Sequence, residues 1–108
     1  LGTWVREREA MTLERAVQRI TTEPAALFGI KNRGRIAKGL AADFAIFDMA
    51  TVGSNKRGEM RYDLPGGGRR LVVPARGVEY TIVNGTPVFE HGKDTGSRPG
   101  EVLRSGRA

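Results

Sequence analysis

The sequence predicts an α+β fold in which short N-terminal helices are followed by a small antiparallel β-sheet. In the first part of the chain, apolar residues recur at the spacing of one helix face, at Leu13, Ala16, Val17 and Ile20. Farther along, residues 42–48 and 78–83 are apolar runs of strand length. Asn84-Gly85 follows the second run, and this pair is a strong hairpin signal because both turn residues adopt positive φ.

Three short helices are expected before residue 30. Leu1, Trp4 and Val5 lie at helical spacing, which predicts a first helix over residues 2–10. The apolar stripe predicts a second helix over residues 13–20, with Thr12 as its N-cap. Thr and Pro at 22–24 restart the chain into a third helix over residues 24–28, and Gly29 supplies the left-handed residue at its end.

Beyond residue 30 the pattern changes from helices to strands and turns. Residues 35–38 fit either a brief strand or an extended turn, and the near-continuous apolar run at 42–48 predicts a strand buried on both faces. Residues 52–70 are rich in Gly and polar residues and predict a long, mobile loop, followed by a short edge strand at 71–73 before Pro74. The hairpin strands at 78–83 and 86–90 come next, and residues 92–108 read as a tail rich in Gly and Arg.

Composition excludes several classes of protein. The chain has 108 residues and no Cys, which removes disulfides and thiolate metal sites and fits a cytoplasmic location. Its apolar runs are far shorter than the roughly 20 residues of a membrane span, and no signal peptide is visible. The net charge of +6 is spread along the chain, which favours solvated charge over a nucleic-acid interface. The absence of an initiator Met leads us to expect a fragment.

For each candidate site residue, a structural role is a simpler interpretation than a catalytic or binding role. Asp43 lies at the start of a strand, where its carboxylate is expected to accept hydrogen bonds at a turn. His91 is the only His, and a metal site needs three or four converging ligands. The stretch 65–70 lacks the Lys-Ser or Lys-Thr of a phosphate loop, and the glycines at 34 and 39 more simply permit turns. The tail arginines could bind an anionic partner, but the simpler interpretation is that they are paired on the protein surface or solvated. These arginines are Arg98, Arg104 and Arg107.

Short motifs follow one another in a specific order, which carries a family resemblance. They are Thr12-Leu13-Glu14-Arg15-Ala16-Val17, Thr21-Thr22-Glu23-Pro24-Ala25, Gly29-Ile30, Arg33-Gly34-Arg35-Ile36, Gly39, Ala42-Asp43-Phe44, Phe47-Asp48 and Val83-Asn84-Gly85. This order resembles the closing segment of the amidohydrolase superfamily. Residues 1–7 and 96–104 further resemble the N-acyl-D-amino-acid deacylases (D-aminoacylases). The resemblance covers nearly the whole chain except residues 51–73.

The resemblance implies that this chain is the structural part of a larger enzyme whose catalytic residues lie elsewhere. Members hydrolyse amide bonds, here of N-acyl-D-amino acids, with a divalent metal, usually zinc, that activates water at the mouth of a TIM barrel. The resemblance places those ligands before residue 1, so this chain is expected to contribute no catalytic, cofactor-binding or metal-binding residue and to be inactive alone. Residues 1–30 then correspond to terminal helices of the barrel, residues 31–92 to a small β-domain with a flexible loop at 51–70, and residues 93–108 to the tail.

The same resemblance implies partners. The helices are expected to pack on the missing barrel, and the strands to complete a composite β-sandwich with N-terminal strands. Separated from both, the chain is expected to self-associate through its helix stripe or its sheet edges. The alternative is an independent small basic domain that binds nucleic acid or another anion, for which binding with a steep salt dependence would be the signature. Membrane partners are not expected.

Overall fold

Short helices form the N-terminal part of the chain in the computed structural model, which describes residues 1–55 and 57–104. The first turn, η1 (Gly2–Glu7), is a π-helix and ends earlier than the predicted helix over residues 2–10. Helix α1 (Leu13–Ile20) has the predicted bounds, and the Thr12 hydroxyl accepts the backbone N–H of Arg15 at 3.2 Å as its N-cap.

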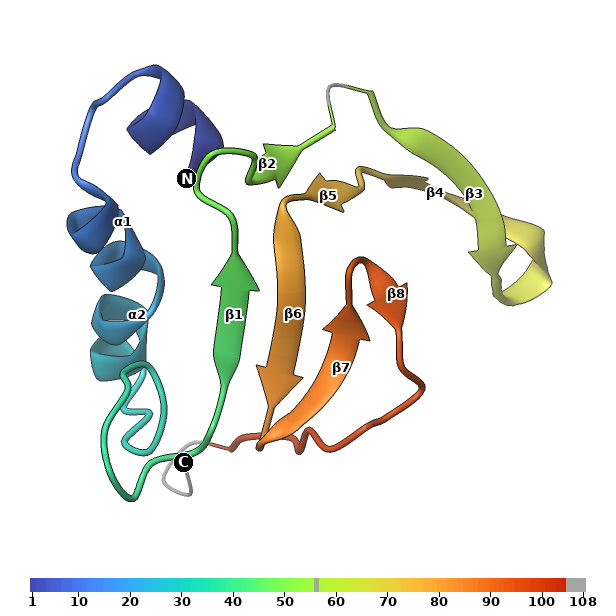
Figure 1. Ribbon diagram of the computed structural model, residues 1–108. Coiled ribbons are helices and arrows are strands. Elements are labelled where there is room, and N and C mark those ends of the chain that lie inside the picture. The colour runs from blue at the N-terminus through green and yellow to red at the C-terminus, as the bar shows by residue number, and fades with distance from the viewer. Residues whose placement is uncertain (56, 105–108) are drawn as a thin grey trace.

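The third helix, α2 (Thr22–Leu27), begins two residues before its predicted start. It packs beside α1 (Figure 1), and Gly29 follows it with a φ of +70°, which is the left-handed ending that the sequence predicts. Residues 35–38 belong to no strand, so the extended-turn alternative is the correct one.

The largest sheet has four antiparallel strands in the order β1-β6-β7-β8 (Figure 1). These strands are β1 (Phe44–Phe47), β6 (Val78–Val83), β7 (Thr86–Glu90) and β8 (Lys93–Asp94). The predicted hairpin is confirmed: Val83 pairs with Thr86, and the two turn residues, Asn84 and Gly85, have φ of +49° and +79°. Strand β8 lies in the stretch that the sequence predicted as tail, so that prediction is wrong at 93–94.

Two smaller sheets replace the predicted loop at 52–70. Strand β2 (Gly53–Ser54) pairs with β5 (Ala75–Arg76), and β3 (Glu59–Leu64) pairs with β4 (Gly68–Val72). The turn η2 (Pro65–Gly67) joins β3 to β4, and this hairpin projects on the side of the molecule away from the helices (Figure 1). The loop prediction is therefore wrong here, because strands pair along this stretch and Gly66 and Gly67 form the turn between β3 and β4. Residues 71 and 72 of the expected edge strand are the end of the longer β4, and residue 73 lies outside it.

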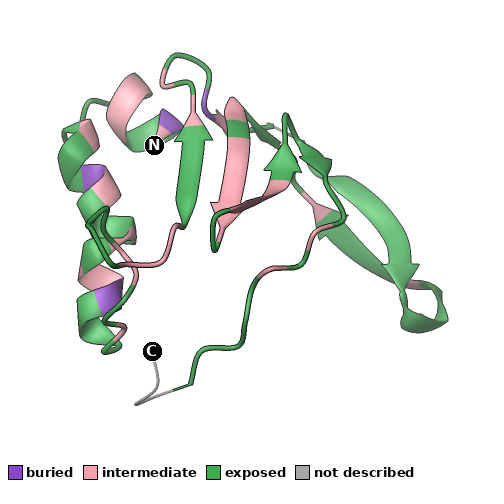
Figure 2. Cartoon of the chain, turned by 60° about the horizontal axis from the view of Figure 1, so that its bottom comes forward, coloured by how far each residue is buried: buried purple, intermediate pink, exposed green. Residues whose placement is uncertain are grey.

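Very few side chains are buried by this arrangement. Among the described residues, the buried hydrophobic residues are Ala16, Ala25 and Val52, which lie on the helices and next to β2 (Figure 2). The radius of gyration is 15.9 Å, whereas a compact domain of this length has about 13 Å. The structure is thus α+β, as predicted, but open.

Large apolar side chains remain exposed on every part of the described chain. The predicted burial of β1 on both faces is wrong, because Phe44 and Ile46 are exposed. In the apolar stripe of α1, Ala16 is buried whereas Ile20, at the C-terminal end of the helix, is 65% exposed. The exposed part of the stripe is therefore its C-terminal end. Other exposed residues are Leu27, Phe28, Ile36, Met60, Tyr62, Leu64, Leu71, Val73 and Phe89. Among the described residues, no helix has both the length and the apolar composition needed to cross a bilayer.

Candidate functional site

Three polar side chains meet where the 31–41 turn, the start of β1 and the β6–β7 hairpin come together. One oxygen of the Asp43 carboxylate accepts the backbone N–H of Asn84 at 2.9 Å, and the other pairs with Nη1 of Arg33. Nη2 of Arg33 donates to the side-chain oxygen of Asn84 at 2.7 Å. The Arg33 side chain is only 13% exposed. We call Arg33, Asp43 and Asn84 the polar clasp.

The polar clasp also holds the tail. The side-chain amide of Asn84 donates to the carbonyl of Pro99 at 2.9 Å, and Arg33 lies 3.7 Å from the Glu101 carboxylate. Four segments far apart in the sequence are therefore tied to one another. The Nε of Arg33 is buried without a partner among the described residues.

The electrostatics of Asp43 fit a structural role. Burial raises the pKa of its carboxyl, but the hydrogen bond from the Asn84 backbone and the hydrogen bond and charge of Arg33 outweigh burial and leave the pKa below its ordinary value. A carboxylate that is already paired and hard to protonate is a poor general acid or base at neutral pH. The expectation that Asp43 accepts hydrogen bonds at a turn is confirmed.

His91 lies on the surface, after β7. It is exposed, has a φ of +49°, and packs edge-on against Tyr80 with 5.2 Å between the ring centroids. Nowhere in residues 1–55 and 57–104 do three His, Cys, Asp or Glu side chains gather closely enough to hold a metal ion.

The glycine-rich stretches form turns. Gly66 and Gly67 have positive φ in the turn between β3 and β4, and Arg70 next to them donates twice to the Asp63 carboxylate, at 2.7 and 2.6 Å. Gly34 and Gly39 likewise have positive φ, as expected for residues that permit turns.

The tail arginine Arg98 has an acidic partner close by in the sequence. Arg98 donates to both oxygens of Asp94 at 2.9 and 2.8 Å, and this bond together with the backbone N–H of Gly96 lowers the pKa of Asp94 to about 2. Arg104 is exposed, and Arg107 lies outside the described residues. Elsewhere Arg15 pairs with Glu23 at 2.5 Å. Because Arg98 and Arg15 already have acidic partners in separate places, neither supports the nucleic-acid alternative.

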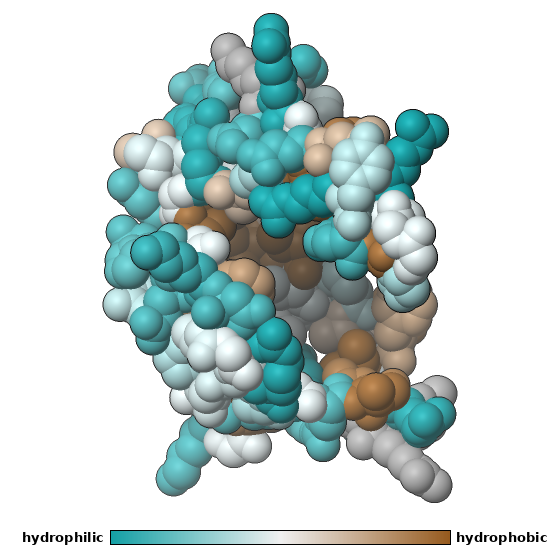
Figure 3. All heavy atoms as spheres, turned by 90° about the vertical axis from the view of Figure 1, so that its right-hand side faces the viewer, coloured by the Kyte–Doolittle hydropathy of each residue, from teal (hydrophilic) through white to brown (hydrophobic). Residues whose placement is uncertain are grey.

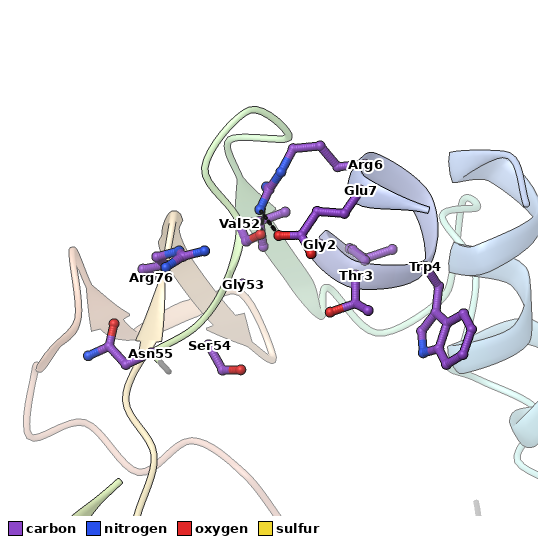
Figure 4. A pocket seen from close by; sticks show the side chains of 11 residues that line it. Gly2, Thr3, Trp4, Arg6, Glu7, Val52, Gly53, Ser54, Asn55 and Arg76 are labelled. Atoms are coloured by element: carbon purple, nitrogen blue, oxygen red, sulfur yellow. Dashed lines mark hydrogen bonds and ion pairs between the residues drawn. The ribbon is translucent and has the colours of Figure 1, made fainter. Parts of the chain in front are cut away.

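A pocket of about 680 Å³ lies between η1 and the small β2–β5 sheet (Figure 4). Arg6 crosses one wall, where its Nη1 donates to the carbonyls of Met49 at 3.1 Å and Val52 at 2.7 Å. Arg76 lies across β2 from Arg6, and its Nε donates to the carbonyl of Thr51 at 3.3 Å. The remaining lining residues are Leu1, Gly2, Thr3, Trp4, Glu7, Gly53, Ser54 and Asn55.

Comparison with known proteins establishes the family. The sequence profile of the Amidohydrolase family matches residues 1–89. The chain belongs to the amidohydrolase family.

Among the relatives of this amidohydrolase chain are three deacylases from Alcaligenes xylosoxydans xylosoxydans. An N-acyl-D-glutamate deacylase is 39% identical over 104 residues, covering 96% of the chain and 19% of the relative. An N-acyl-D-aspartate deacylase is 32% identical over 108 residues, covering 100% and 20%, and a D-aminoacylase is 34% identical over 103 residues, covering 95% and 19%. The chain thus spans about a fifth of the length of these relatives. No solved structure matches it.

The resemblance to amidohydrolases and D-aminoacylases is confirmed by these matches, but sequence reasoning missed the residues that organise the amidohydrolase chain. Arg6 and Arg33 entered the sequence analysis as charges and Asn84 as a turn residue, and all three belong to the motifs that carry the resemblance, but their contacts were not predicted. Arg6 bonds to residues 43 and 46 positions away and Arg33 bonds to Asn84, 51 positions away, and no local spacing encodes such partners.

Proposed function

We propose that this chain is the C-terminal structural portion of a metal-dependent hydrolase that acts on linear amide bonds of N-acyl-D-amino acids. The whole enzyme would convert an acyl-D-amino acid and water into a D-amino acid and a carboxylate. The chain by itself would be non-catalytic and would serve as scaffold for the catalytic barrel.

One observation carries this proposal. Three relatives whose names specify deacylases or an aminoacylase of D-amino acids align with 95% to 100% of the chain. Because each alignment uses only 19% to 20% of the relative, the proposal assigns the reaction to the whole enzyme.

Zinc is the metal proposed for the whole enzyme, and the described residues do not fit it as ligands. His91 is exposed and lies beside Tyr80, and Asp43 is occupied by Arg33 and Asn84. A zinc site takes three or four converging nitrogen, oxygen or sulfur ligands. We therefore assign no step through the metal to this chain, and expect a His-x-His motif in the gene upstream of Leu1.

The exposed apolar surface supports a scaffold role. Ile20, Leu27 and Phe28 are 65%, 79% and 74% exposed along the helices, where we place the contact with the barrel. Seen from the side of the β3–β4 hairpin, apolar side chains line part of a hollow in the molecule (Figure 3). We place further strands of the composite β-sandwich there, because a surface of this kind marks an interaction site.

The proposal is tested by assaying two proteins side by side, the 108-residue chain and the longer gene product that contains it. Each is incubated with N-acetyl-D-glutamate or N-acetyl-D-aspartate, with and without added zinc, and D-amino-acid release is measured. We expect turnover by the long protein alone, lost on chelation, with the L-enantiomers as controls.

Two outcomes would contradict the proposal. Metal-dependent turnover by the pure 108-residue chain would place catalytic groups within it. A long protein that binds zinc yet hydrolyses no N-acyl-D-amino acid would remove the proposed substrate class.

A further inference from the structure

Two guanidinium groups from distant parts of the chain converge on Gly53, at the centre of the pocket between η1 and β2. A β-carbon placed on Gly53 would lie 3.4 Å from Nη2 of Arg76 and 3.8 Å from Nη2 of Arg6. Figure 4 shows the two arginines on either side of this glycine. The space that a side chain would fill is therefore bordered by two cations.

Both guanidinium groups donate to backbone carbonyls, Arg6 from a half-buried side chain and Arg76 from an exposed one. Arg6 uses Nη1 for the carbonyls of Met49 and Val52, and Arg76 uses Nε for the carbonyl of Thr51. The Arg6 side chain is only 25% exposed. These contacts orient the two guanidinium groups through other nitrogens and leave Nη2 of each at the border of the empty space, where Nη2 of Arg6 also lies 3.9 Å from the Glu7 carboxylate.

The charge around this space is positive. Glu7 is the acidic lining residue, and its carboxylate is 57% exposed and 3.9 Å from Arg6. Arg76 has no acidic partner within the part of the chain that the structure describes. Ser54 and Asn55 line the same pocket and offer further hydrogen-bond donors.

We propose that Arg6 and Arg76 form a binding site for a small oxyanion, a carboxylate or phosphate group seated over Gly53. Guanidinium groups bind both anions through paired N–H donors, and donors held in advance lose less entropy on binding. The site is independent of the proposed hydrolysis, since it needs neither metal nor barrel.

Gly53 makes the proposal testable without disturbing the arginines. A β-carbon at this position would meet its nearest side-chain atoms at ordinary van der Waals distances, and the φ of Gly53 is not positive, so Gly53→Ala is compatible with the fold. Its methyl group would occupy the position of the anion. Arg6 is a poorer target, because its loss would leave two carbonyls unpaired.

The experiment is an NMR titration of the isotope-labelled 108-residue chain with inorganic phosphate and, separately, with acetate, at constant ionic strength set by sodium chloride. We expect saturable shifts of the Gly53 and Ser54 amides and of the Arg76 Nε–H. The anion that saturates at the lower concentration identifies the ligand class. Gly53→Ala and Arg76→Gln should each weaken binding about tenfold or more, as the loss of a charged hydrogen bond would.

Arg69→Gln is the matched control, because it removes the same charge from an exposed strand position outside the pocket. It should leave the affinity unchanged. Equal weakening by Arg69→Gln and Arg76→Gln would show attraction by net charge alone and overturn the proposal. The absence of saturable shifts with both anions, or unchanged binding by Gly53→Ala, would also overturn it.

Discussion

At the scale of single residues, the polar clasp is the most connected feature of the molecule. Arg33, Asp43 and Asn84 come from three segments. The Arg33 side chain bonds to the side chains of Asp43 and Asn84, and the Asp43 carboxylate also accepts the backbone N–H of Asn84. A largely buried arginine that loses its carboxylate is costly, because the charge is left without compensation. The clasp therefore couples the turn before β1 to the main hairpin.

The low pKa of Asp43 makes the stability of the chain depend on pH. A carboxyl whose pKa is lower in the folded state than its ordinary 3.8 stabilises the fold above that value, and this contribution is lost as the pH falls through the folded pKa. We predict that the free energy of unfolding, measured by urea denaturation, declines in this acidic range. Asp43→Asn should reduce stability at neutral pH and flatten the acidic decline.

Glu79→Gln is the control for this prediction, since Glu79 is exposed and its side chain forms no ion pair within the described residues. It should keep the wild-type pH profile. An Asp43→Asn protein whose acidic decline matches that of the wild type would show that other carboxyls dominate.

At the scale of elements, the β6–β7 hairpin depends on its turn. Gly85 has a φ of +79°, a conformation that costs a residue with a β-carbon about 1–2 kcal/mol. We predict that Gly85→Ala lowers the free energy of unfolding by that amount in urea denaturation. Gly100→Ala is the matched control, because its φ is not positive and its β-carbon would meet only Val83 at 3.8 Å. Equal losses from both variants would contradict the turn argument.

The elements also show what local sequence predicts well. Helix α1 and the Asn84-Gly85 hairpin were predicted because their signals lie within a few residues: a stripe with a cap, and a turn pair between apolar runs. The family was likewise predictable from ordered motifs. The polar clasp and the pocket beside Arg6 were not, because the bond from Arg33 to Asn84 and the bonds from Arg6 to its carbonyl partners join residues 43 to 51 positions apart.

The β3–β4 hairpin was missed for a different reason. Its first strand, Glu59–Leu64, alternates polar and apolar residues with the period of two that a strand requires. The composition of the stretch, with Gly58 before it and Pro65 to Gly68 after it, outweighed that alternation in the prediction. In the structure, these glycines belong to the turn and to close packing, since a β-carbon on Gly58 would lie 2.6 Å from Leu71.

At the scale of the whole molecule, exposed apolar surface dominates. We predict that the isolated chain self-associates as its concentration rises, measured by size-exclusion chromatography with light scattering. Ile20→Lys should weaken association if the helix face is used, whereas an unchanged oligomer would point to the sheet edges. Val102→Lys, at an exposed apolar position in the tail, is the control. A stable monomer at high concentration would contradict the prediction.

The small number of buried side chains has a thermodynamic consequence. Unfolding raises the heat capacity mainly by hydrating apolar groups, by about 12–15 cal/mol/K per residue in an ordinary domain. Here Ala16, Ala25 and Val52 are the buried hydrophobic residues of the described chain, so unfolding the chain alone would newly hydrate less apolar surface than in an ordinary domain. Its stability curve should be correspondingly shallower with temperature, and part of the curvature typical of a globular enzyme would arise only when the exposed faces are covered.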